Sequence, residues 1–196
     1  MKPDGSEVFT VLQLLKGTLD GGDVLFTGQE FFVGLSTRTN QAAVDTMKRV
    51  FGDAYPVTAL DMNLAHATSN VTTAGEAAQP VLHLKSIMTV CGKGQLAVAD
   101  TPLGRALFER LNTKSVRHRP IPYQPVWIPG AEASAANVLY IDDRIVFRAA
   151  EEHPQAAQIL SKVGLMHRSL NMSELAKADG ALTCCSLLIP QTARLS

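Results

Sequence analysis

The sequence has little cysteine and no excess of charge of either sign. Its three cysteines are Cys91, Cys184 and Cys185, and the last two are adjacent, where a bridge would be strained, so no disulfide framework is expected. Eighteen basic residues balance eighteen acidic ones, which gives no field to attract nucleic acid or an anionic membrane. These shortages predict a protein of the reducing cytoplasm with no nucleic-acid partner.

Long apolar runs and metal-binding spacings are also missing. The segment Val8–Leu15 is mostly apolar but far shorter than the roughly 20 residues of a membrane span, and no cleavage site follows it. No Cys or His pairs stand at zinc-like intervals, so neither a metal nor another cofactor is expected. Hydrophobic residues nevertheless make up 46% of the 196 residues and charged residues 18%, which is typical of a packed globular domain.

A strand–strand–helix–strand order of apolar periodicity recurs three times along the chain. The first helix carries Ala42, Ala43, Met47, Val50 and Phe51 along one stripe. The expected elements, in order, are Val24–Thr27, Phe31–Leu35, Asn40–Phe51, Pro56–Leu60; Val81–Val90, Gln95–Ala99, Thr101–Leu111, Val126–Pro129; Val138–Ile141, Ile145–Arg148, Pro154–Val163 and Leu165–Arg168.

Repeats of this size predict an α/β fold whose units are blades of a radial array. The polar segment Asp61–Gln79 is predicted to be a loop inserted between the first two units. Three units do not easily close a ring. An ordinary α+β domain with irregular repeats explains the periodicity equally well.

Two segments offer titratable groups before or on predicted strands. Asp20 and Asp23 flank a Gly-Gly bend just before the first strand, where glycines allow a sharp turn that exposes the acids. A capped turn without a catalytic role explains them as well. His83 and Lys85 would share one face of the strand Val81–Val90, and a lone histidine on a strand is usually structural or exposed. A histidine and a separate cysteine can also form a nucleophilic pair.

Two further segments carry a nucleophile candidate and a cation. Cys184 and Cys185 precede Ser186–Ile189, read as a buried strand, so alternation would turn Cys184 toward an active site and Cys185 into the packing. A buried cysteine can equally be a small hydrophobic residue. Arg38, between a strand and a helix, could bind a carboxylate with its guanidinium or stay solvated in its loop.

Together these segments resemble the dimethylargininase family over about Thr18–Pro190. The resemblance lies in Leu19–Gly28 with Glu30–Ser36 and Arg38–Gln41, in Leu82-His83-Leu84-Lys85-Ser86, and in Met172–Leu175, Asp179-Gly180 and Leu182-Thr183-Cys184-Cys185-Ser186. The family belongs to the guanidine-modifying superfamily, whose fold is a five-bladed α/β propeller of ββαβ units. The resemblance therefore implies about three blades of an incomplete ring.

The resemblance also implies the role of each site residue. Cys184 would be the nucleophile, His83 the acid/base and Asp20 the carboxylate that orients the histidine. Arg38 would hold the α-carboxylate of the substrate. The backbone at Ala178 and Asp179 would contact its amino-acid end.

The implied function is hydrolysis of asymmetric dimethylarginine or monomethylarginine to citrulline and a methylamine, through a thiouronium on the cysteine. Family resemblance links such an activity to nitric oxide regulation. The partner would be this small-molecule substrate, with no nucleic acid or membrane involved. Arginine deimination or amidine transfer is the competing chemistry within the superfamily.

Residues 1–17 show no match to the family, whereas 18–196 is predicted to be a partial catalytic domain. The guanidinium-binding acids of the family have no counterpart in Met1–Gly17. The alternative to an active hydrolase is therefore a catalytically impaired, truncated isoform that lacks the N-terminal blades. Open blade edges would then favour self-association.

Overall fold

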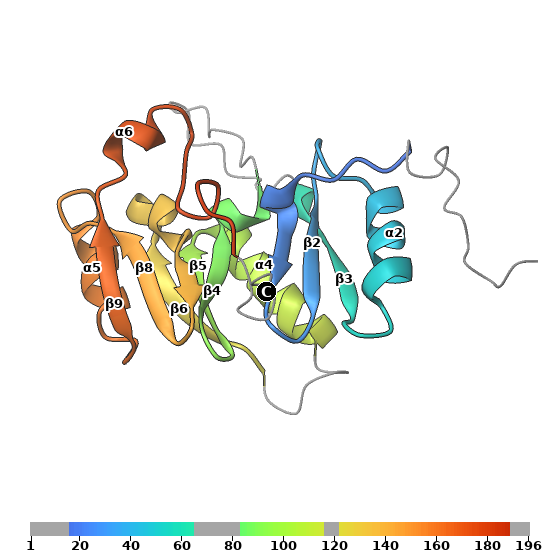
Figure 1. The fold of residues 1–196 in the computed structure, drawn as a ribbon, viewed down its shortest axis with the longest axis horizontal. Coiled ribbons are helices and arrows are strands. Elements are labelled where there is room, and N and C mark those ends of the chain that lie inside the picture. Colours follow the sequence, from blue (N-terminus) through green and yellow to red (C-terminus); the bar gives the residue numbers. More distant parts are fainter. Residues whose placement is uncertain (1–15, 65–82, 116–121, 189–196) are drawn as a thin grey trace, which may run out of the picture.

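The computed structural model describes residues 16–64, 83–115 and 122–188. Within this part of the chain, three three-stranded sheets stand side by side (Figure 1). Each sheet contains an antiparallel pair followed by a parallel pair, and a helix makes the parallel crossover. The chain is thus a mixed α/β protein built of repeated strand–strand–helix–strand units.

Each unit follows the previous one in sequence, and short 3-10 helices precede or follow the sheets. The first unit comprises η1 (Gly21–Asp23), β1 (Val24–Phe26), β2 (Phe31–Leu35), α2 (Gln41–Phe51), β3 (Val57–Asp61) and η2 (Met62–Leu64). The second comprises η3 (Leu84–Ser86), β4 (Met88–Gly92), β5 (Gln95–Asp100), α4 (Pro102–Ser115) and β6 (Gln124–Pro129). The third comprises η4 (Gly130–Ala136), β7 (Leu139–Ile141), β8 (Arg144–Arg148), α5 (Pro154–Leu160), β9 (Met166–Leu170) and α6 (Ser173–Ala176).

The predicted order of elements is confirmed in all three units, with bounds that shift by a few residues. Asn40 caps α2 because its side chain accepts a hydrogen bond from Ala43 N at 3.1 Å. The turn that joins β7 to β8 has Asp142 and Asp143 both at positive φ, as a tight hairpin requires. The apolar stripe of α2 is shorter than predicted, because Val50 and Phe51 are 52% and 41% exposed.

Two strand predictions are wrong. Residues 83–87 do not extend the strand, because Ser86 N and Ile87 N donate to the carbonyls of His83 and Leu84 and turn the chain into η3. The cysteines do not precede a buried strand either. Cys184 N and Cys185 N both donate to Ala181 O in an exposed turn, and Leu187 beyond them is 92% exposed, with no described strand as partner.

Other predictions concern residues outside the described part. Residues 65–79 of the predicted inserted loop and residues 1–15 of the predicted N-terminal segment lie there, as does Ile189. The boundary at residue 17 therefore stays a prediction. At its described edge, Lys16 O accepts from Asn40 Nδ2 and Thr18 O accepts from Asn40 N, which attaches the chain to the start of α2.

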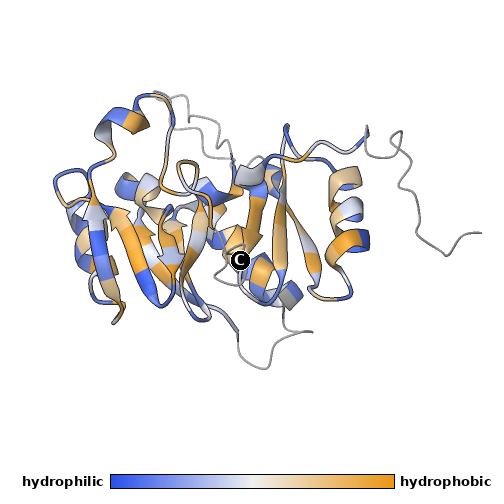
Figure 2. Cartoon of the chain, viewed as in Figure 1, coloured by the Kyte–Doolittle hydropathy of each residue, from blue (hydrophilic) through white to orange (hydrophobic). Residues whose placement is uncertain are grey.

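Apolar packing joins each unit to the next, as the orange strands and helices of Figure 2 indicate. One core cluster combines Phe32 and Leu60 of the first unit with Leu96, Leu107 and Leu111 of the second, so α4 packs against β3. A second cluster combines Ala97 and Ile128 with Ile145, Ala156 and Leu160 of the third, so α5 packs against β6. Each of these helices therefore covers the preceding sheet and fixes neighbouring units together.

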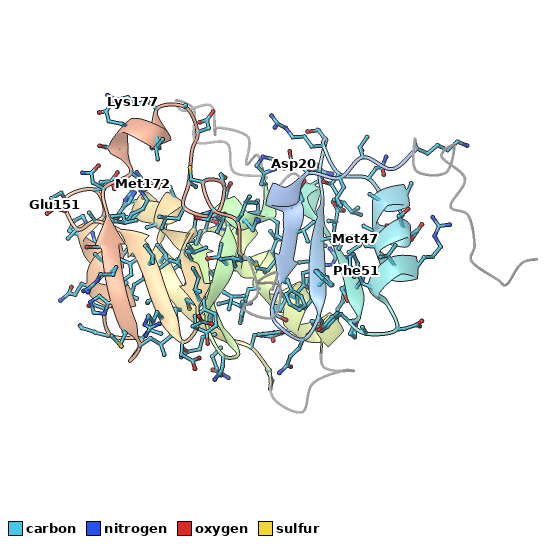
Figure 3. The ribbon with its side chains drawn as sticks, viewed as in Figure 1. Asp20, Met47, Phe51, Glu151, Met172 and Lys177 are labelled. Atoms are coloured by element: carbon cyan, nitrogen blue, oxygen red, sulfur yellow. The ribbon has the colours of Figure 1, made fainter. Side chains whose placement is uncertain are left out.

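Among the described residues, helix α2 packs mainly on its own sheet. Val44 and Met47 contact Val33 and Val57 in a separate core cluster. Met47 and Phe51 lie on successive turns of this helix at the end of the molecule (Figure 3). At the opposite end, all five residues of β9 are exposed.

A buried hydroxyl fixes the connection between the second and third units. Thr89, on β4 and 2% exposed, donates from Oγ1 to Ala136 O at 2.6 Å and accepts from Val138 N at 3.0 Å. Both partners belong to buried residues on either side of Asn137. One side chain thus satisfies two buried peptide groups where η4 passes into β7.

Replacing Thr89 by valine should lower the free energy of unfolding by about 1–3 kcal/mol, because it removes both hydrogen bonds of the hydroxyl and leaves the two buried peptide groups only their mutual bond, from Val138 N to Ala136 O at 3.2 Å. Urea denaturation measures the change. The matched control is Thr113→Val, which removes an exposed hydroxyl bonded to Glu109 O within α4 and should change stability by no more than about 0.5 kcal/mol. Equal losses in the two variants would contradict the role of Thr89.

Candidate active site

The turn before β1 presents Asp20 to solvent. Asp20 N donates to Thr39 Oγ1 at 3.0 Å, and its Oδ1 accepts from Gly22 N at 2.9 Å as the cap of η1. The Gly22 hydrogen bond, and then the charges of His83 and Arg38, hold the pKa of the Asp20 carboxyl below its usual value against a contribution from burial that raises it. Asp20 therefore stays ionised at neutral pH, and it lies near the side chains of His83, Arg38 and Lys85.

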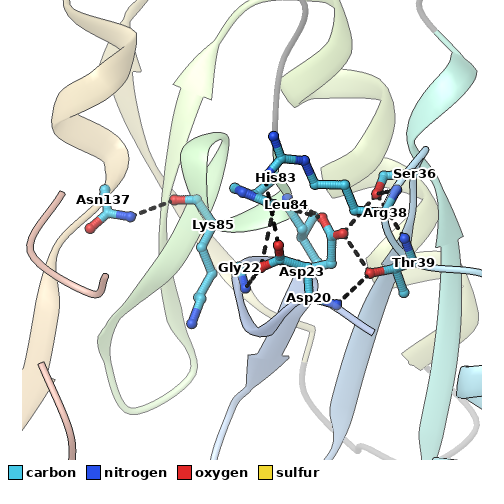
Figure 4. A network of polar contacts seen from close by, with 10 residues as sticks. All are labelled: Asp20, Gly22, Asp23, Ser36, Arg38, Thr39, His83, Leu84, Lys85 and Asn137. Atoms are coloured by element: carbon cyan, nitrogen blue, oxygen red, sulfur yellow. Dashed lines mark hydrogen bonds and ion pairs between the residues drawn. The ribbon is translucent and has the colours of Figure 1, made fainter. Parts of the chain in front are cut away.

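His83 faces two carboxylates. Its Nδ1 lies 3.8 Å from Asp20 Oδ1 and 3.7 Å from Asp23 Oδ1, and its side chain is 17% exposed (Figure 4). This buried Nδ1 makes no hydrogen bond within the described part of the chain. Two oxygens near one ring nitrogen favour a proton on Nδ1, which leaves Nε2 to exchange protons with other groups.

Gly22 forms the floor on which the imidazole rests. A Cβ at Gly22 would lie 2.5 Å from His83 Cγ, closer than any real side-chain contact. Only glycine therefore lets the ring lie against the η1 backbone. The Gly-Gly bend is therefore needed both for the sharp turn of the backbone and for the close approach of His83.

Asp23, the second acid of the bend, is fully buried and is the hub of the cluster. Its Oδ2 accepts from Ser36 Oγ and Thr39 Oγ1, both at 2.7 Å, and its Oδ1 accepts from Leu84 N at 3.1 Å. These bonds join the η1 turn, the loop after β2 and the His83 segment. Asp23 therefore holds the site together and is not a carboxylate free to meet a substrate.

Arg38 lies beside Asp20 on the loop between β2 and α2. Its Nη1 is 3.8 Å from Asp20 Oδ2, its side chain is 52% exposed, and its N donates to Ser36 Oγ at 3.0 Å. The single long contact leaves most of the guanidinium donors exposed to solvent. The structure thus brings Asp20, His83 and Arg38 into one cluster, although 63 residues separate Asp20 from His83.

Cys184 is connected to this cluster by hydrogen bonds of the preceding residue, Thr183. Thr183 bonds to Asn137 through its N–H and its Oγ1, and Asn137 also donates to Lys85 O (Figure 4 shows the last bond). The Lys85 ammonium interacts with the charges of Cys184, Asp20 and Asp23. Cys184 and Cys185 are both exposed in one turn, so the expected contrast between a facing and a packed cysteine is wrong.

Lys85 is half-buried, and burial lowers the pKa of its ammonium, whereas the nearby Cys184 and Asp20 raise it. No hydrogen bond of its Nζ is found in the described ranges 16–64, 83–115 and 122–188. Lys85 does not share a strand face with His83, because η3 replaces that strand. It places a positive charge between the cysteine turn and the two carboxylates.

Ala178 and Asp179 follow α6 in an exposed turn. Ala178 N donates to Leu175 O, Asp179 N donates to Ala176 O, and Asp179 has a positive φ of 56°. Their neighbour Lys177 lies at the same end of the sheets as Asp20 (Figure 3). Within the described residues, no hydrogen bond or ion pair joins this turn to Asp20, His83 or Arg38, so its part in the site stays a prediction.

Sequence reasoning missed Asn137 and the structural role of Asp23. Asn137 is a single amide between Ala135-Ala136 and Val138-Leu139. A lone polar residue in such an apolar run signals a buried group that needs hydrogen bonds. Asp23 carried no separate signal, because its partners come from the distant residues Ser36, Thr39 and Leu84.

Neither a cluster of metal ligands nor a membrane-spanning helix occurs in the described part of the chain. No group of three or more His, Cys, Asp or Glu side chains in this part of the chain is arranged to hold a metal ion. None of the helices in the same residues is long and apolar enough to cross a bilayer.

Comparisons with known proteins identify relatives. No family model matches the chain. An N(G),N(G)-dimethylarginine dimethylaminohydrolase of Streptomyces coelicolor is 29% identical over 175 residues, covering 87% of this chain and 54% of the relative. The enzyme of that name from Pseudomonas aeruginosa is 25% identical over 171 residues, covering 87% and 56%. The chain thus spans about half the length of the curated relatives it matches.

The fold agrees with this kinship. The structure superposes on that of a dimethylarginine dimethylaminohydrolase from Pseudomonas aeruginosa in complex with citrulline, with a TM-score of 0.62 and 20% identity, over 86% of this chain and 55% of the other. An amidinotransferase of Microseira wollei shares the fold with a TM-score of 0.63 and 15% identity, over 87% and 47%. In sequence the chain is thus similar to dimethylarginine dimethylaminohydrolases, and in fold it is similar to the solved structures of such an enzyme and of an amidinotransferase.

Proposed function

We propose that the protein hydrolyses N-omega-methylated arginine, asymmetric dimethylarginine or monomethylarginine, to citrulline and a methylamine. The observation that carries this proposal is the cluster of Asp20, His83 and Arg38, to which Asn137 attaches the turn of Cys184. An enzyme of similar fold has been crystallised with citrulline, and another as an adduct with S-methyl-L-thiocitrulline. Both ligands carry the amino-acid end and the carbon that this chemistry needs.

The first step is attack on the guanidinium carbon, a resonance-stabilised cation that water attacks poorly. The Cys184 thiolate forms an S–C bond, and the C–N bond to the methylated nitrogen breaks. His83, protonated at both ring nitrogens, gives its Nε2 proton to the departing amine. A thiouronium remains on Cys184, and the methylamine leaves neutral.

The second step reverses these roles. Neutral His83 takes one proton from water, whose oxygen attacks the thiouronium carbon. The C–S bond then breaks, the remaining hydroxyl proton passes to solvent, and citrulline and the thiolate are released. Asp20 favours the Nδ1–H tautomer and the imidazolium, and the closeness of Asp23 Oδ1 adds to this effect. The Lys85 ammonium interacts electrostatically with Cys184 and so places a positive charge near the reacting sulfur.

Arg38 is the group proposed to hold the substrate α-carboxylate. Its side chain is 52% exposed and its guanidinium makes one long contact at 3.8 Å, so its donors are available for a bidentate pair. The backbone at Ala178 and Asp179 is proposed to meet the same end of the substrate. By family resemblance, removal of methylated arginines would connect the protein to nitric oxide regulation.

The three repeated units are proposed to be blades of the family's α/β propeller, with the Asp20–His83 cluster directed toward its centre. The helix-to-preceding-sheet packing of α4 and α5 supports this arrangement. The free thiols of Cys91, Cys184 and Cys185 support a reducing compartment such as the cytoplasm. The exposed edge strand β9 supports self-association of copies.

Cys184 should carry the reaction and Cys185 should not. The test measures citrulline formed from asymmetric dimethylarginine, together with the intact mass after incubation with 4-chloro-2-hydroxymethylpyridine, a compound seen as an adduct of a relative. We expect Cys184→Ser to abolish citrulline formation and labelling by displacement of chloride. Cys185→Ser, a matched change in the same turn, should keep both. Labelling and turnover that survive Cys184→Ser but fail in Cys185→Ser would reverse the assignment.

Asp20→Asn should lower kcat by roughly 10²- to 10⁴-fold, because the amide keeps the shape but loses the charge that stabilises the imidazolium. KM should change little, since Asp20 is not assigned to substrate binding. Steady-state citrulline assays measure both constants. Asp53→Asn, an exposed acid beyond α2, is the control and should behave as wild type. An unchanged kcat in Asp20→Asn would remove Asp20 from the mechanism.

Arg38→Met should raise KM for dimethylarginine by about tenfold or more, because the loss of a charge-assisted pair to a carboxylate costs about 1.5–3 kcal/mol. Labelling of Cys184 by iodoacetamide, which has no carboxylate, should stay within about twofold of wild type. Arg49→Met, on the exposed side of α2, serves as the control. A fall in kcat at unchanged KM would contradict a binding role for Arg38.

A further inference from the structure

Asn137 lies at the junction of the two segments that carry the proposed catalytic pair. It follows η4 and is 3% exposed. Its Nδ2 donates to Lys85 O and to Thr183 Oγ1, each at 2.9 Å, and its Oδ1 accepts from Thr183 N at 3.0 Å. Lys85 is two residues beyond His83, and Thr183 directly precedes Cys184.

The direction of the Asn137 amide is determined by its partners. Lys85 O can only accept a hydrogen bond, and Thr183 N can only donate one. A reversed amide would place its oxygen against the Lys85 carbonyl and its NH2 group against the Thr183 N–H. The orientation with Nδ2 toward Lys85 and Oδ1 toward Thr183 N is thus the only one that satisfies both.

The backbone on both sides of Asn137 is fixed as well. Thr89 Oγ1 donates to Ala136 O and accepts from Val138 N, the peptide groups that flank Asn137. Ala136 and Val138 are buried, so the loop has little freedom to shift. The amide is therefore presented to Lys85 and Thr183 in a preorganised position.

We propose that Asn137 is a positioning residue that sets the distance between the Cys184 thiol and the His83 imidazole. This inference rests on the proposed function, because it takes Cys184 and His83 as the reacting pair. Both Nδ2 hydrogens of Asn137 are used by Lys85 and Thr183, so the side chain acts through them and not on the substrate. We call these three hydrogen bonds of Asn137 to Lys85 and Thr183 the Asn137 clamp. Between described residues, no other hydrogen bond joins the Cys184 turn to the His83 segment.

The clamp also brings Cys184 into the field of Lys85. The side-chain ammonium of Lys85 interacts with Cys184, and the backbone carbonyl of Lys85 is the group that Asn137 binds. Loss of Asn137 would let the cysteine turn move away from this charge. Both the position of the thiol and the charge beside it would then change.

The test uses the full chain with Cys185→Ser, which leaves Cys184 as the exposed thiol, since Cys91 is buried. Asn137→Ala removes the whole clamp. Thr183→Val removes the Oγ1 acceptor only, and Thr183→Ser keeps it. Asn112→Ala is the matched control, because Asn112 makes a similar two-bond clamp to the backbone of Tyr123 away from the site.

We expect Asn137→Ala to lower kcat for citrulline formation by about tenfold to a hundredfold, as small misplacements of reacting groups do, with KM within about twofold of wild type. Thr183→Val should lower kcat in the same way but less, Thr183→Ser should restore it, and Asn112→Ala should leave it unchanged. The double variant of Asn137→Ala and Thr183→Val should be no slower than Asn137→Ala alone, because both changes break one clamp.

Alkylation of Cys184 by iodoacetamide at pH 7 gives a readout that needs no turnover. It should slow severalfold in Asn137→Ala and stay unchanged in Asn112→Ala. An unchanged kcat and alkylation rate in Asn137→Ala, or equal kcat in Thr183→Val and Thr183→Ser, would overturn the proposal. Should Asn137→Ala fail to fold, the Thr183 pair decides. A wild-type chain without turnover or pyridine labelling would refute the proposed function, and the alkylation rates would still decide whether Asn137 positions Cys184.

Discussion

The hydrogen bonds that converge on the Asp23 carboxylate hold the candidate site in one piece. This group is fully buried, and a buried carboxylate is costly unless donors surround it. Ser36, Thr39 and the N–H of Leu84 supply those donors from two segments distant in sequence. The buried Asp23 carboxylate is therefore stabilised only when these segments lie together. His83, next to Leu84, then lies against Gly22 and beside Asp20.

A second buried polar group extends this arrangement to the cysteine. Asn137 connects the Lys85 carbonyl with Thr183, so the third unit contributes its residues to a site that begins in the first. Apolar packing of α4 on the first sheet and α5 on the second keeps the units in the register that both hubs require. Hydrophobic burial thus aligns the units, and the hydrogen bonds of Asp23 and Asn137 orient the side chains of the site.

Periodicity predicted the order of the repeated units because each strand and helix shows its own spacing of apolar residues, as in Phe31–Leu35, where prediction and structure coincide. It failed at His83, where the N–H of Leu84 is taken by a distant carboxylate and a 3-10 turn replaces the strand. It failed again after Cys185, because a strand needs a partner that local sequence does not reveal. The cluster of Asp20, His83 and Arg38 was predicted from family resemblance alone, since no spacing relates residues 63 positions apart.

The covalent intermediate is the most direct test of the account. Wild-type protein is mixed with asymmetric dimethylarginine, quenched in acid within one turnover, digested and analysed by mass spectrometry. The account predicts a thiouronium modification on the peptide that contains Cys184-Cys185, located on Cys184 by fragmentation and absent when Cys184 is replaced by serine. Citrulline that accumulates without any modified cysteine, or with the modification on Cys185, would contradict it.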